Sequence, residues 1–243
     1  MGNHKTVFYR TLIRINIKGV VYLMKKLIKK EEFLRYVDHS LLKPQLTQKE
    51  IIEGLEFAKK NHCASVCINP TNLDIAYKIL KDSDVKIGTV IGFPSGAHTT
   101  FSKVAETKDA YTRGAVEMDM VINITSLKSG ETDRVKKDIQ AVVEASPAIV
   151  KVILENCFLT KEEIVTACKL AEEAGAAYVK TSTGFAAGGA KVEDIKLMRK
   201  TVSDKVKIKA AGGISTLDDC LKMIEAGADR IGISRTQKII SEL

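Results

Sequence analysis

Eight short extended segments alternate with helical segments along this chain, and that alternation limits the possible folds more than any other feature. Strict alternation of strand and helix predicts parallel strands joined by right-handed crossovers. Eight such units within about 210 residues favour a single closed (β/α)8 barrel, the TIM-barrel architecture, over an open doubly wound sheet. No Gly-x-Gly-x-x-Gly pattern follows the first segment, which weakens the dinucleotide-binding alternative. The extended segments are residues 36–40, 65–69, 86–92, 116–123, 149–155, 177–182, 206–211 and 230–234.

Helical patterns fill the intervals between these segments. Thr47 followed by Glu50 fits a capping box, so a helix is predicted to begin there and to end near Asn61. A chain of 243 residues without a linker or a shift in composition suits one domain. Further helices are predicted from residue 70 onward and over residues 102–113, 132–145, 161–174, 191–202 and 216–226, with a last one at the carboxyl end.

The positive charge of the chain is concentrated at its amino end. Residues 1–30 contain 8 of the 38 basic residues and no acidic residue, so residues 31–243 have 30 basic against 30 acidic residues. The body of the protein is therefore neutral, which argues against nucleic-acid binding. We expect residues 1–23 to be a basic extension, either disordered or the product of a start placed upstream of Met24, and residues 24–243 to be the barrel domain.

Cysteine usage and hydropathy indicate the compartment. The five cysteines are scattered and never spaced as Cys-x-x-Cys, which argues against a disulfide framework or a structural zinc site. No apolar run approaches the 18 or so residues of a membrane span. We therefore expect a soluble, cytoplasmic protein without membrane contact. His39 and His98 lack metal-binding spacing, so we expect no metal site, and His39 is predicted to be a hydrogen-bonded residue at the rim.

The period of two within the strands predicts which side chains face the barrel interior. In the strands at residues 116–123, 149–155, 177–182 and 206–211, apolar side chains share one face, which suits packing under the helices. The opposite face would place four polar side chains inside the barrel: Asp119, Lys151, Lys180 and Lys209. An interior ion-pair network without a function is the alternative, but burying three lysines against one or two carboxylates lowers stability.

Such a cluster suits chemistry through an imine. A lysine amine must be neutral to attack a carbonyl, and burial or a second ammonium group nearby lowers its pKa. Lys180 and Lys209 could each perturb the other, and this reasoning does not decide which of them forms the imine. Asp119 is the candidate proton carrier, acting with Lys209 directly or through water.

Glycine-rich turns follow the last three strands and predict a phosphate site. The loops after strands seven and eight of such barrels commonly bind phosphate through backbone amides. The amides of Thr183 and Gly184, after Lys180, could also face an anion, and Arg235 could add a charged contact. The candidate phosphate-binding residues are Gly184, Gly212, Gly213, Gly232, Ser234 and Arg235.

At several separate motifs the chain resembles the deoxyribose-phosphate aldolases, a family of class I aldolases that work through a Schiff base. The resemblance runs from about Asp38 to Thr236. It rests on the motifs DHSLLKP (38–44), SVCINP (65–70), VIGFPSGAHTTFSKVAE (90–106), EMDMVIN (117–123), KVILE (151–155), KTSTGF (180–185), KAAGGI (209–214) and RIGIS (230–234).

The resemblance implies residue roles and a reaction. It makes Lys180 the Schiff-base lysine, makes Asp119 and Lys209 the proton donor and acceptor pair, and places three residues near the substrate: Asp38, Cys67 and Lys151. Of these, Cys67 is predicted to pack rather than to react. The implied reaction is reversible cleavage of 2-deoxy-D-ribose 5-phosphate to D-glyceraldehyde 3-phosphate and acetaldehyde, in deoxyribonucleotide catabolism. The resemblance implies no metal or organic cofactor, small sugar phosphates and aldehydes as the molecules bound, and a homo-oligomer, either dimer or tetramer.

Two departures from the family pattern bear on these expectations. The chain lacks the longer tail ending in tyrosine that some members carry, and Arg235 replaces the usual second serine after the last strand. Two alternatives stay open: a related Schiff-base aldolase acting on another phosphorylated sugar, and a sugar-phosphate-binding barrel without catalysis.

Overall fold

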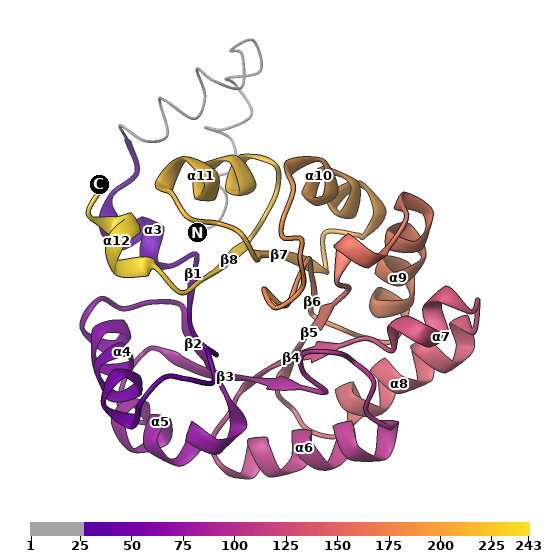
Figure 1. Ribbon diagram of the computed structural model, residues 1–243, viewed down its shortest axis with the longest axis horizontal. Coiled ribbons are helices and arrows are strands. Elements are labelled where there is room, and N and C mark those ends of the chain that lie inside the picture. The colour runs from indigo at the N-terminus through magenta and orange to yellow at the C-terminus, as the bar shows by residue number, and fades with distance from the viewer. Residues whose placement is uncertain (1–26) are drawn as a thin grey trace, which may run out of the picture.

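The protein is a closed barrel of parallel strands, as the alternation predicts. The computed structural model describes residues 27–243, and its strands follow one another around the barrel until the last pairs with the first (Figure 1). The basic extension expected over residues 1–23 lies outside the described residues. The strands are β1 (Val37–Leu41), β2 (Ser65–Ile68), β3 (Lys86–Ile91), β4 (Glu117–Val121), β5 (Ile149–Ile153), β6 (Tyr178–Lys180), β7 (Lys207–Ala211) and β8 (Arg230–Ile233).

Helices form a ring around the strands, and Figure 1 shows this ring from one end of the barrel. Within residues 27–243, none of them has the length and apolar character needed to cross a membrane. The helices are α3 (Lys30–Leu34), α4 (Gln48–Lys60), η1 (Pro70–Asn72), α5 (Leu73–Leu80), α6 (Thr100–Thr112), α7 (Ile124–Lys128), α8 (Thr132–Glu144), η2 (Asn156–Phe158), α9 (Lys161–Glu173), α10 (Val192–Thr201), α11 (Leu217–Glu225) and α12 (Thr236–Ile240).

Side-chain caps fix the starts of several helices. The predicted capping box is present at α4, where Thr47 accepts from the Glu50 amide and the Glu50 carboxylate accepts from the Thr47 amide. The same arrangement begins α9 at Thr160 and α11 at Thr216. Each box satisfies backbone donors that the first helical turn leaves without partners.

Strand parity divides the barrel into an apolar outer layer and a polar interior, as predicted. Val152, Val179 and Ile208 are fully buried in the core cluster between strands and helices. The alternate residues on the same strands point inward, and there they form ion pairs with one another. The hydrophobic core that stabilises this fold therefore lies between the strands and the surrounding helices. The barrel interior contains the charged side chains.

Two short helices, one helix start and several strand ends differ from the prediction; β4, β5 and β6 are each shorter than the segments predicted over residues 116–123, 149–155 and 177–182. The short helix α7, which follows β4, and the single turn η2, which follows β5, were not predicted, because segments of five and three residues are too short to show periodicity. The Asn123 side chain accepts from the Ser126 amide and so caps α7. The α6 helix begins at Thr100, two residues before the predicted start, because the Thr99 hydroxyl caps it.

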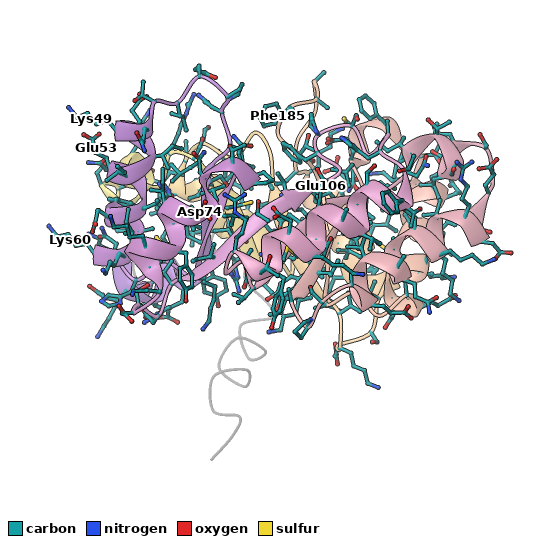
Figure 2. The ribbon with its side chains drawn as sticks, turned by 90° about the horizontal axis from the view of Figure 1, so that it is seen from below. Lys49, Glu53, Lys60, Asp74, Glu106 and Phe185 are labelled. Carbon is teal, nitrogen blue, oxygen red and sulfur yellow. The ribbon has the colours of Figure 1, made fainter. Side chains whose placement is uncertain are left out.

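The loop between β3 and α6, which carries much of the longest sequence motif, is held tightly against the end of β4. Lys103 is fully buried, and its ammonium group donates to the Val121 carbonyl at 2.9 Å and to Asp138 at 2.5 Å. A carboxylate oxygen of Glu106, labelled in Figure 2, accepts from the Gly92 amide at 2.7 Å. Gly96 adopts φ +70° and lies so close to β4 that an added Cβ would be 1.9 Å from the Ile122 carbonyl oxygen. This motif therefore fixes the backbone just beyond Asp119.

Candidate active site

Four of the predicted polar side chains meet inside the barrel around one carboxylate. The ammonium groups of Lys180 and Lys209 each lie 2.7 Å from Asp119 Oδ2, and that of Lys151 lies 3.3 Å from Oδ1. Asp38, from β1, adds a second carboxylate, 2.5 Å from Lys209 and 3.0 Å from Lys151. The side chains of these five residues are at most 3% exposed, so water screens their charges poorly.

A lower layer of the same network contains two charged residues that were not assigned to the site from sequence. Arg230 of β8 lies 2.5 Å from Asp38 Oδ1 and 3.6 Å from Glu117, and Glu117 also pairs with Lys151. Lys151 and Arg230 both lie 5.8 Å from the centre of the Tyr178 ring, within reach of a cation–π contact. Strand parity places Glu117 inward, but only the register of the closed barrel brings Arg230 to it.

Charge balance distinguishes the lysines. The network joins four basic side chains to three carboxylates, so its charges balance when one basic group is neutral. Burial is the largest influence on the pKa of Lys180 and lowers it, and the ammonium group of Lys209 lowers it further against the attraction of Asp119. Burial also disfavours the charged forms of Lys209 and Lys151, but their paired carboxylates outweigh it and raise both pKa values.

The pKa values of the two aspartates in the cluster are lowered. Burial alone would raise the pKa of Asp119, but the ammonium groups around it, led by Lys151 and Lys180, hold that pKa well below its usual range. The pKa of Asp38 is likewise lowered, since Lys151 and Lys209 outweigh its burial. Both carboxylates are therefore ionised at neutral pH. Asp119 Oδ1 is buried and has no hydrogen-bond donor among the described residues, so it remains an available acceptor.

Cys67 lies beside the cluster as a buried thiol. Its Sγ is 3.9 Å from Asp119 Oδ2, and it packs with Leu42, Val90 and Phe93 in an apolar cluster inside the barrel. Burial, with the charge of Asp119, raises the pKa of Cys67 to about 11. A thiol with so high a pKa is a poor nucleophile, so the contribution of Cys67 here is packing.

A pocket of about 150 Å³ opens above the cluster at the carboxyl ends of the strands. Lys180 lines it, together with five of the six residues predicted to contact phosphate. Arg235 is the exception: it occupies the N-cap position of α12 and does not line the pocket. The lining residues are Ser40, Leu42, Lys43, Lys180, Thr183, Gly184, Phe185, Ala211, Gly212, Gly213, Ile214, Gly232, Ile233 and Ser234.

The glycines of this pocket serve two purposes: three adopt backbone conformations that other residues disfavour, and one leaves space for a neighbouring side chain. Gly184, Gly212 and Gly213 adopt φ of +83°, +85° and +73°, a region that disfavours other residues. No acceptor within the described residues takes the amide hydrogens of these three residues, so an anion could accept from them. At Gly232, an added Cβ would lie 3.1 Å from Lys209 Cε, so a small residue there leaves room for the lysine.

The turn after β6 is held by a buried glutamate. The Glu155 carboxylate accepts from the Thr183 amide at 3.2 Å and also from the Thr183 hydroxyl. Glu155 itself adopts a left-handed conformation, φ +56°, that directs its side chain to this turn. The expectation that the Thr183 amide faces an anion is therefore wrong, because Glu155 occupies that donor.

Two aromatic rings meet at the mouth of the site. Phe93, after β3, and Phe185, after β6, lie 5.1 Å apart in an edge-to-face arrangement. Figure 2 shows Phe185 on a loop that rises at one end of the barrel. This contact links the loop after β3 to the loop after β6.

His39 and His98 both lie outside the interior cluster. His39 is buried, its Nδ1 lies 2.8 Å from Thr236 Oγ1, and its ring packs on Phe57, so it is hydrogen-bonded but not at the rim. His98 is exposed. Over residues 27–243, no three His, Cys, Asp or Glu side chains are grouped in a way that would hold a metal ion.

A parallel barrel with a buried lysine of lowered pKa beneath a glycine-lined pocket is the arrangement expected of a (β/α)8-barrel aldolase. A family model described as DeoC/LacD family aldolase matches residues 32–241. The chain belongs to this family.

Individual relatives agree with that membership. A deoxyribose-phosphate aldolase from Caldanaerobacter subterraneus subsp. tengcongensis is 53% identical over 224 residues, which cover 89% of this chain and 97% of the relative. One from Clostridium botulinum is 57% identical over 201 residues, 82% of this chain and 95% of the relative.

Solved structures are similar in fold. The tetrameric deoxyribose phosphate aldolase from Aeropyrum pernix aligns with a TM-score of 0.85 at 25% identity, covering 93% of this chain and 97% of its own. QR15, an aldolase, aligns with a TM-score of 0.84 at 40% identity, covering 87% of this chain and 95% of its own.

Proposed function

We propose that this protein is a deoxyribose-phosphate aldolase that cleaves 2-deoxy-D-ribose 5-phosphate reversibly to D-glyceraldehyde 3-phosphate and acetaldehyde. The observation that carries the proposal is the position of Lys180, which is the buried lysine that both lines the pocket and has a lowered pKa. The names of the curated relatives support the choice of substrate.

The three lysines around Asp119 have different roles in this proposal. A neutral amine is required to attack a carbonyl, and Lys180 meets that requirement while facing the space a substrate would enter. Lys209 and Lys151 have raised pKa values and do not line the pocket, so they remain ammonium groups. This difference supports Lys180 over Lys209 as the Schiff-base lysine.

The steps of the proposed reaction follow from these protonation states of the lysines and of Asp119. The Lys180 amine adds to the C1 aldehyde of the open-chain sugar, and loss of water gives an imine. The protonated imine accepts the electron pair as the bond between C2 and C3 breaks, while the C3 hydroxyl proton passes toward the ionised Asp119. The resulting enamine takes a proton at C2 from the Asp119 and Lys209 pair, and hydrolysis releases acetaldehyde. Every proton and electron pair is carried by the substrate, these side chains or water.

Trapping with borohydride tests this proposal directly. The protein is incubated with acetaldehyde and sodium borohydride and analysed by intact and peptide mass spectrometry. We expect one ethyl group on Lys180 and none in the Lys180→Ala variant. An adduct on Lys209 would reverse the two lysine roles, and the absence of any adduct would refute the imine mechanism.

A substrate comparison separates this aldolase from its alternatives. We expect 2-deoxyribose 5-phosphate to yield glyceraldehyde 3-phosphate in a coupled assay, and other phosphorylated aldoses to react at least about tenfold more slowly. Faster cleavage of another sugar phosphate would indicate the related aldolase. Binding without cleavage would indicate the non-catalytic barrel.

We further propose a homo-oligomer, dimer or tetramer, in the cytoplasm. The tetramer of the Aeropyrum pernix protein supports oligomerisation. The five cysteines all lie in the described residues as free thiols, four of them buried, which suits a reducing compartment. Light scattering coupled to gel filtration tests the first point, and fractionation of cells tests the second.

A further inference from the structure

Lys43 is a cation at the pocket to which the site description gives no role. It follows β1, where the Leu42 carbonyl accepts from the Asn69 side chain at 3.1 Å and the Lys43 carbonyl accepts from the Leu46 amide at 3.2 Å. These bonds and Pro44 fix the backbone of the turn. The Lys43 side chain stays exposed at the pocket wall.

Among the residues that line the pocket, only Lys43 and Lys180 are charged. Lys180 lies at the base, 2.7 Å from Asp119, and its reactive form is neutral. The ammonium group of Lys43 has no ion-pair or hydrogen-bond partner within residues 27–243. The pocket wall therefore presents one full positive charge that the protein itself does not neutralise.

The wall beside Lys43 presents backbone donors. The amide hydrogens of Gly184, Gly212 and Gly213 have no acceptors in the described chain. Because β1 pairs with β8, the turn after β1 lies next to Ser234, and β8 in turn pairs with β7, which ends just before Gly212. Amides carry only partial charges, so a phosphate dianion in such a nest gains from a nearby ammonium group. Arg235 does not supply it, because it lies outside the pocket.

We propose that Lys43 is the cationic contact for the substrate phosphate and so sets the preference for phosphorylated over unphosphorylated sugars. The proposal rests on the proposed aldolase function for the identity of the sugar. The charge contact itself depends only on the pocket.

The test compares 2-deoxyribose 5-phosphate with 2-deoxyribose in the wild type, Lys43→Met and Lys43→Arg. We expect Lys43→Met to lower the ratio of kcat/KM for the two sugars by roughly 10-fold to 100-fold, chiefly through KM for the phosphate ester. Lys43→Arg keeps the charge and should restore most of that ratio. Lys60→Met, on the outer helix α4 (Figure 2), is the matched control and should leave the ratio unchanged.

A second readout needs no turnover. Inorganic phosphate titrated by calorimetry should bind the wild type and bind Lys43→Met at least tenfold more weakly. If the wild type binds phosphate through Lys43 but cleaves no sugar, the aldolase proposal fails and the charge contact stands. An unchanged ratio and unchanged phosphate binding in Lys43→Met, or a loss in Arg235→Met instead, would overturn the assignment to Lys43.

Discussion

The three lysines of the interior cluster around Asp119 differ in how many carboxylates they contact. Lys180 contacts Asp119 alone, Lys209 contacts Asp119 and Asp38, and Lys151 contacts both of these and Glu117. Burial disfavours the charged form of each lysine, and each carboxylate opposes that effect. Among these three, only Lys180, with a single carboxylate partner, has a lowered pKa, and it is also the one that lines the pocket.

This difference predicts the effect of removing Lys209 on the reactivity of Lys180. The ammonium group of Lys209 lowers the pKa of Lys180, so Lys209→Met should raise it. The pH midpoint of borohydride trapping with acetaldehyde should then move to higher pH. Each unit of that shift removes about nine tenths of the neutral amine at pH 7. The measurement is the trapped fraction of Lys180 across a pH series.

The midpoint, rather than the amount trapped, is the decisive quantity. Loss of a proton donor alone would reduce trapping equally at every pH and leave the midpoint in place. Lys60→Met removes an exposed lysine far from the cluster and should reproduce the wild-type curve. A midpoint that stays fixed or moves to lower pH in Lys209→Met would contradict the charge argument.

The sequence predicted which side chains point into the barrel better than it predicted which of them form ion pairs with one another. Alternation within each strand decides direction, so Asp119, Lys151, Lys180 and Lys209 were placed together correctly. Which charges touch depends on the register between strands of the closed barrel, and no local pattern encodes that. Arg230 and Glu155 were missed for this reason, since their partners come from other strands or turns.

At the scale of elements, β1 and α12 are joined by a histidine that burial keeps neutral. His39 of β1 bonds to Thr236, the first residue of α12, and burial lowers the pKa of His39 to about 4. An unfolded histidine has a pKa near 6.5. Between these values the unfolded chain binds a proton that the folded chain does not, so stability rises with pH across this window.

Acid should therefore weaken the fold before the carboxylates titrate. As pH falls from 6.5 toward 4, we expect the free energy of unfolding to decrease by about 3 kcal/mol through His39. Urea unfolding at a fixed protein concentration measures this slope. His39→Gln should flatten it, while His62→Gln, which removes an exposed histidine, should not. Equal slopes in the wild type and His39→Gln would argue against a neutral, buried His39.

The order and approximate starts of the elements followed the sequence where a clear period or a cap was present, but strand ends did not, since β6 spans Tyr178–Lys180 where residues 177–182 were predicted. The capping box at Thr47 located the start of α4, and parity located β5 and β7. The short helix α7 depends on the side chain of Asn123, and η2 follows a residue in a left-handed conformation, Glu155. Each of these two short helices depends on the conformation of a single residue, and a single residue leaves no periodic signal in the sequence.

At the scale of the whole molecule, ion pairs replace apolar packing in the middle of the barrel. Asp38, Glu117 and Arg230 join β1, β4 and β8 across the interior. Because these groups are almost fully buried, removing one partner leaves a charge that water does not solvate. The interior network is therefore sensitive to single truncations in a way that surface ion pairs are not.

Two arginine-to-methionine variants test this contrast. Arg230→Met leaves Asp38 and Glu117 short of positive charge and should lower the free energy of unfolding by roughly 3–5 kcal/mol. Arg35→Met breaks a pair of similar length, 2.7 Å to Asp84, in which both side chains are exposed, and should cost less than about 1 kcal/mol. Urea unfolding of both variants measures the difference. Equal losses would show that the interior pair is no more important than the surface pair.

The pairing of β1 with β8 also has a consequence for the time at which a newly made chain becomes active. Asp38 and Arg230 are separated by 192 residues, yet they share one ion pair in the network that surrounds Lys180. During synthesis, a ribosome releases Lys180 before Lys209 and Arg230, so the lysine emerges before the groups that surround it. A partly synthesised chain thus contains Lys180 without the burial and the neighbouring ammonium group that lower its pKa. The surroundings that lower the pKa of Lys180 are therefore complete only when the last strand has joined the first.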